Sequence, residues 1–83
     1  MTPAQVLILE TLEREGTAER WYLVCSVAAV TVGTVTRRGI DRGERALGTL
    51  ARRGLVQLNA AARYEFTPAG QLALEAAVVR GEG

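Results

Sequence analysis

The sequence predicts a single α+β domain over residues 1–83, in which three helices precede a β-hairpin and a fourth helix follows it. Apolar residues recur at helical spacing in residues 3–15, 41–53 and 68–79. Two short β-favouring runs, 55–58 and 64–66, are separated by only residues 59–63. Hydrophobic residues make up 48% of the 83 residues, which is enough for a core and argues against disorder.

The first helix is expected over residues 3–15. Thr2 can cap it, Pro3 suits the first helical position, and Gln5 can complete a capping box. Gly16 ends the helix because glycine readily adopts the left-handed backbone found after helix ends. The residues expected to face the core are Val6, Ile8, Leu9 and Leu12.

The second helix is expected over residues 18–30, with Thr17 as its cap and Glu19 in its first turn. This stretch is apolar nearly all round, so we expect it to be largely buried. Its apolar residues are Trp21, Leu23, Val24, Val27, Ala28 and Val30. No cation stands beside Cys25, which favours an inert thiol in the core.

The third helix has two candidate starting points. Asp41, with Glu44 three residues later, forms a capping box and gives our preferred helix, 41–53. Alternatively, the helix begins near Thr34 or Thr36 and includes the glycines at positions 39 and 43, at about 1 kcal/mol each. Leu47, Leu50 and Ala51 are expected to face inward.

The third helix ends in a tight corner. Arg52 and Arg53 lie in its last turn, where cations complement the helix dipole, and Gly54 follows at the C′ position. The strands 55–58 and 64–66 then form a hairpin.

The fourth helix is expected over residues 68–79. Thr67 is its cap, and Pro68 takes its first position. Its expected apolar face consists of Leu72, Ala76 and Val79.

Charge is unevenly distributed along the chain. The net charge is only +1, but residues 37–53 hold six arginines against Asp41 and Glu44, a net charge of +4. The rest of the chain has a net charge of −3. A basic segment in an otherwise acidic chain indicates a local surface for an anionic partner.

Several function classes are not expected. The sequence has no His, which removes the commonest general base and metal ligand, and its single Cys25 excludes an internal disulfide. We expect no catalysis, no metal and no cofactor. No basic region followed by an apolar core begins the chain, and no apolar run reaches the length of a membrane span. These features favour a protein of the reducing cytoplasm.

Two motifs resemble parts of winged helix-turn-helix regulators. The run Arg-Ala-Leu-x-x-Leu-x-x-Arg-Gly-Leu-Val, residues 45–56, resembles the end of their recognition helix. The run Tyr-Glu-Phe-Thr-Pro-Ala-Gly, residues 64–70, resembles the wing exit of the MarR and PadR types. The likeness covers about residues 6–74. The stretch before Leu47 is longer than in these families, so either the turn is enlarged or the third helix is lengthened.

This resemblance implies a transcriptional regulator that binds double-stranded DNA sequence-specifically as a homodimer. The third helix would lie in the major groove, and the hairpin wing would reach the adjacent backbone or minor groove. The residues that the resemblance places near DNA on the third helix are Thr36, Arg37, Arg38, Arg42 and Arg45. Asn59 and Arg63 are the candidates on the wing.

Arg38, Arg42 and Arg45 share one helical face, away from Leu47 and Leu50. An arginine fork can bind guanine O6 and N7 together, or contact phosphates instead. The alternative to DNA contact is that these arginines form a solvent-exposed face and pair with nearby carboxylates.

A second class of function also remains open. The near-neutral net charge fits a protein-interaction module, such as an adaptor or an inhibitor, that binds no DNA. In either case the short chain leaves little room for a sensing domain, so no small-molecule ligand is expected. The face of the fourth helix is the expected dimer contact.

Overall fold

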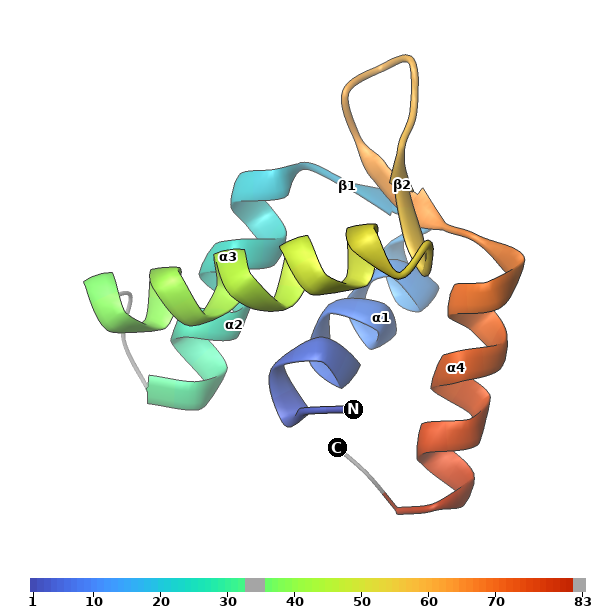
Figure 1. Cartoon of the computed structure of the whole chain (residues 1–83). Coiled ribbons are helices and arrows are strands. Elements are labelled where there is room, and N and C mark those ends of the chain that lie inside the picture. The colour runs from blue at the N-terminus through green and yellow to red at the C-terminus, as the bar shows by residue number, and fades with distance from the viewer. Residues whose placement is uncertain (33–35, 82–83) are drawn as a thin grey trace.

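The computed structural model of the chain describes residues 1–32 and 36–81. Within them the protein is an α+β domain of four helices and a small antiparallel sheet (Figure 1). In chain order the elements are α1 (Pro3–Glu15), β1 (Thr17–Ala18), α2 (Arg20–Val32), α3 (Arg37–Arg52), β2 (Val56–Leu58), β3 (Tyr64–Phe66) and α4 (Pro68–Val79). Figure 1 shows α3 crossing α1 and α2, with α4 at one end and the β2–β3 hairpin projecting beyond the helices.

The predicted bounds of α1 and α4 are confirmed, and so are their local signals. Thr2 and Gln5 form the reciprocal capping box, with both hydrogen bonds at 3.2 Å. Gly16 ends α1 with a φ of 84°. Thr67 caps α4 by accepting a hydrogen bond from the Gly70 amide at 3.0 Å. These signals were predictable because each involves residues three or four positions apart.

The prediction for Thr17 was wrong. Thr17 and Ala18 form the strand β1, which pairs with β3 opposite Glu65 and Tyr64. The sheet therefore has three strands in the order β1–β3–β2, rather than the hairpin alone. Because β1 is formed by pairing with a strand more than forty residues away, no local pattern in the sequence reveals it.

The preferred start of α3 at Asp41 was also wrong. The helix begins one turn earlier with Thr36 as its N-cap, whose hydroxyl accepts a hydrogen bond from the Gly39 amide at 3.1 Å. Of the two alternative starts, Thr36 is therefore the correct one, and Thr34 lies outside the described residues. Asp41 is exposed on the second turn.

The two glycines of α3 allow the helix to pack closely on α2, and Gly39 does so in the turn that precedes Asp41. A Cβ at Gly39 would lie 2.9 Å from the Cα of Ala28, and one at Gly43 would lie 2.8 Å from the carbonyl oxygen of Val24. Both contacts are closer than side chains normally allow, so the two glycines bring the backbones of α2 and α3 together. Their low helix propensity is offset by this packing.

The core lies between α1, α2, α3 and the sheet, and α4 closes it with Leu74 and Ala77. The inward residues predicted for α1 are all buried. On α3, Leu47 and Leu50 are buried as predicted, but Ala46 takes the place expected for Ala51, which is exposed.

Burial of α2 is one-sided, contrary to the prediction. Its buried side, formed by Leu23, Val24, Val27 and Ala28, packs on α1 and α3. Trp21 is 58% exposed and Val30 is 68% exposed, while Cys25 is only half-buried. A helix that covers one side of a small core leaves its other side in solvent, whatever its composition.

No helix in residues 1–32 and 36–81 is long and apolar enough to span a membrane.

Candidate nucleic-acid interface

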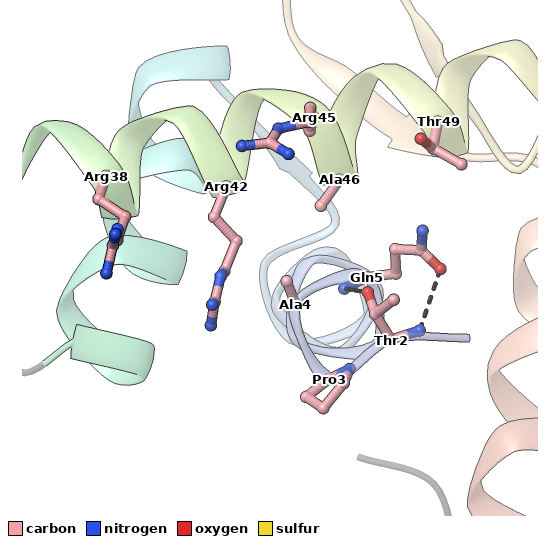
Figure 2. A pocket seen from close by; sticks show the side chains of 9 residues that line it. All are labelled: Thr2, Pro3, Ala4, Gln5, Arg38, Arg42, Arg45, Ala46 and Thr49. Atoms are coloured by element: carbon pink, nitrogen blue, oxygen red, sulfur yellow. Dashed lines mark hydrogen bonds between the residues drawn. The ribbon is translucent and has the colours of Figure 1, made fainter.

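Three of the predicted site residues lie together on one side of α3. Arg38, Arg42 and Arg45 line a groove of about 580 Å³ between α3 and the first turn of α1 (Figure 2). Their spacing of four and then three residues places them in one row along the helix. The remaining residues that line the groove are Thr2, Pro3, Ala4, Gln5, Ala46 and Thr49.

The groove is basic and contains no acid. Its lining has three guanidinium groups and no carboxylate, and neither α1 nor α3 has an acidic residue in its first turn. All three arginines are exposed, and within the described part of the chain none of them forms an ion pair. Their charges are therefore uncompensated at close range, which makes this groove attractive to an anion.

The alternative, in which these arginines pair with Asp41, Glu44 and nearby glutamates, is not seen between the described residues. The Arg20 guanidinium at the start of α2 donates to the Glu44 carboxylate at 2.7 Å. Glu44 is thus neutralised from α2, on the side of α3 away from the groove. Between the described residues, no ion pair joins Asp41 to an arginine. We call the side of α3 that carries Arg38, Arg42 and Arg45 the arginine flank.

The other two candidates near the start of α3 differ in whether their side chains are free to contact a ligand. The Thr36 hydroxyl is engaged in capping the helix, so its contribution is to fix where α3 begins. Arg37 is exposed at the first position of the helix but does not line the groove.

The two candidates on the hairpin have internal partners. The Asn59 side-chain oxygen accepts from the amides of Ala61 at 2.9 Å and Arg63 at 3.1 Å, which shapes the loop between β2 and β3. The Arg63 guanidinium donates to the Thr17 hydroxyl at 2.9 Å and lies 3.5 Å from the Glu19 carboxylate. Arg63 therefore ties the loop to β1.

Sequence reasoning missed two features of this surface. The first turn of α1 forms one wall of the groove, and no sequence signal links it to α3 because the contact is long-range. Thr49 continues the row of Arg42 and Arg45 by seven and four residues, so the helical spacing was a usable signal.

Sequence reasoning also missed two exposed aromatic residues on α2. Trp21 was expected in the core, but it and Tyr22 stand in solvent at the start of α2, 58% and 47% exposed. They follow directly on Arg20, which binds Glu44 of α3.

No protein-family model matches the chain, and comparisons with curated proteins and with solved structures likewise give no match. A functional assignment therefore depends on the groove, the charges around it and the arrangement of the elements. In the part of the chain that the structure describes, no three His, Cys, Asp or Glu residues are grouped as metal ligands would be.

Proposed function

We propose that this domain is a small winged-helix transcriptional regulator that binds double-stranded DNA. In this proposal α3 enters the major groove, and the β2–β3 hairpin is the wing that contacts the adjacent backbone or minor groove. The order of the elements supports the proposal, because two helices packed at their backbones precede a hairpin in a three-stranded sheet.

The observation that carries the proposal is the uncompensated arginine flank. Three exposed guanidinium groups lie in a row on one helix, and no carboxylate lines the groove they border. Planar guanidinium forks bind phosphates and guanine edges in bidentate fashion. A helix about 10 Å across also fits the major groove of B-form DNA.

Homodimer formation belongs to the same proposal. On α4, Leu72 is 66% exposed and Val79 is 87% exposed, and Ala76 between them is exposed as well. An apolar strip of this kind supports a contact between two copies. A two-fold pair would double the length of the DNA site and thereby its specificity.

The test begins with selection of bound duplexes from a random DNA pool, together with a measurement of the mass in solution. We expect an inverted-repeat product and a dimer mass. The absence of any duplex bound more tightly than about micromolar at low salt would contradict the proposal, because specific binding is normally far tighter.

The double variant R38A/R42A tests whether these two arginines contribute to DNA binding. We expect it to weaken binding to the selected duplex by about tenfold or more, since each lost arginine contact is worth about 1–3 kcal/mol. The variant R14A/R53A removes the same charge outside the groove and is the control. Equal affinity of R38A/R42A and wild type would remove these residues from the site.

A protein-interaction module is the second candidate, because one observation favours it. Trp21 and Tyr22 are consecutive residues of α2, and both side chains are exposed. These residue types dominate the energetics of protein interfaces. If wild-type protein binds no duplex while W21A abolishes binding to a protein partner, this candidate replaces the DNA-binding proposal.

A further inference from the structure

We infer that the groove beneath the arginine flank holds the sugar–phosphate backbone of one DNA strand, with the first turn of α1 as its second wall. The inference rests on the proposed function and deepens it. It assigns Arg38, Arg42 and Arg45 to phosphates rather than to base edges, and it adds α1 to the DNA-binding surface.

The direction of the arginines is the first argument. The buried residues of α3 define its inner face, and at 100° per residue the positions most nearly opposite them are Asp41, Gly48 and Arg52. By the same spacing the arginine flank is rotated away from Asp41, and it borders α1. Figure 2 shows Arg38 and Arg42 pointing from α3 toward the side on which the first turn of α1 lies. When the side of α3 that carries Asp41 faces base edges, the arginines face the rim of the major groove, where the phosphates lie.

The charge of the groove is the second argument. Its cations all come from α3, and the wall from α1 is uncharged. Thr2 and Gln5 on that wall carry no charge, and the side-chain oxygen of each accepts a hydrogen bond from the backbone amide of the other. A site with three cations and no acid selects for a group with several negative charges.

The length of the row is the third argument. Residues seven apart on a helix are separated by about 10.5 Å along its axis, which is longer than one phosphate group. Each strand of duplex DNA carries a phosphate about every 3.4 Å along the helix axis. The row therefore fits a chain of linked phosphates better than a single ion. Inorganic triphosphate is also a chain of linked phosphates, so it is the competing ligand in the experiment.

The experiment uses the triple variant R38Q/R42Q/R45Q, which removes the charges and keeps much of the side-chain volume. Dissociation constants are measured from about 50 to 300 mM salt, on the selected duplex and on a scrambled duplex of equal length. The variant R14Q/R53Q/R80Q, with three charges removed outside the groove, is the matched control. Circular dichroism checks the folding of both variants.

Backbone binding predicts that the triple variant loses affinity for both duplexes by the same factor, about tenfold or more. The slope of log affinity against log salt should become shallower by about 2.7, because each phosphate contact contributes about 0.9. The control variant should change the slope much less.

Other outcomes would overturn the inference in distinguishable ways. Loss of preference for the selected duplex, with an unchanged salt slope, would mean that the arginines contact bases, and the proposed function would stand. An unchanged affinity for both duplexes would remove the groove from the interface. Binding of inorganic triphosphate to wild type more tightly than duplex, and its loss in the triple variant, would make the groove a polyphosphate site instead. Failure of wild type to bind any duplex would overturn the proposed function as well.

Discussion

At Gly43 the backbone of α3 lies against that of α2, since an added Cβ would stand 2.8 Å from the Val24 carbonyl oxygen and 3.0 Å from its Cα. Neither of these backbone atoms can rotate away as a side chain could. We expect G43A to destabilise the domain by about 1–3 kcal/mol, the usual cost of overpacking, despite the better helix propensity of alanine. Urea unfolding measures this change.

Gly48 provides the matched control on the same helix. An added Cβ there would meet only the end of the Arg52 side chain, at 3.4 Å. We expect G48A to stabilise the domain by up to about 1 kcal/mol, because alanine is the better helix former. If G43A and G48A changed stability alike, the close contact of α2 with α3 would not be limiting.

Single residues also show where sequence reasoning fails. The caps at Thr2 and Thr67 were predictable because their partners lie three positions away. The role of Arg63 was not, because it bonds to Thr17, forty-six residues earlier. Trp21 was misplaced because apolar character alone does not determine which side of a small domain a helix covers.

Among the elements, the corner between α3 and β2 depends on α4. Gly54 turns the chain with a φ of 73°, and its carbonyl accepts a 2.6 Å hydrogen bond from the Thr67 hydroxyl. That hydroxyl also caps α4. At Gly70, an added Cβ would overlap the backbone carbonyl of Leu55, so the start of α4 is pressed against this corner.

We therefore expect T67A to cost about 1–2 kcal/mol, at the upper end for an N-cap, because both hydrogen bonds are lost. T67S should retain most of the stability, since serine keeps the hydroxyl. Thermal unfolding of the two variants provides the comparison. A loss in T67S as large as that in T67A would instead implicate the methyl group of the threonine.

Elements defined by local signals were predictable, and those defined by packing were not. The bounds of α1, β3 and α4 follow from caps, prolines and alternation in the sequence. The strand β1 exists because β3 offers it a partner. The cap at Thr36 was one of the candidate starts of α3, but the packing of Gly39 on α2 that favours this start is a long-range contact. Neither fact is available before the chain is folded.

For the whole molecule, α4 should control assembly. Because Leu72 and Val79 are exposed, L72E/V79E should leave the fold intact. We expect this variant to be monomeric by light scattering and to bind the inverted-repeat duplex more weakly, since the two half-sites would be bound independently. The variant Q71E/V78E, which adds the same charge to another exposed side of the helix, is the control. A dimer mass for L72E/V79E would place the interface elsewhere.

The candidate site was likewise only partly predictable. The charge imbalance in residues 37–53 and the shared face of three arginines could be derived from spacing alone. The groove could not, because its second wall is the first turn of α1. Nor could the sequence show that Glu44 is neutralised from α2 and so leaves the arginines uncompensated.

The bond between Arg20 and Glu44 has a consequence for how the domain meets a long polyanion. One edge of α3 carries the ion pair of Glu44 with Arg20, and the other carries the three arginines that form no ion pair with any described residue, so the charge is asymmetric across this helix. If the proposed DNA binding holds, this asymmetry would orient an approaching duplex before any base is contacted. In a dimer with two-fold symmetry, this charge asymmetry points in opposite directions in the two copies. The two copies would therefore engage different strands of the duplex.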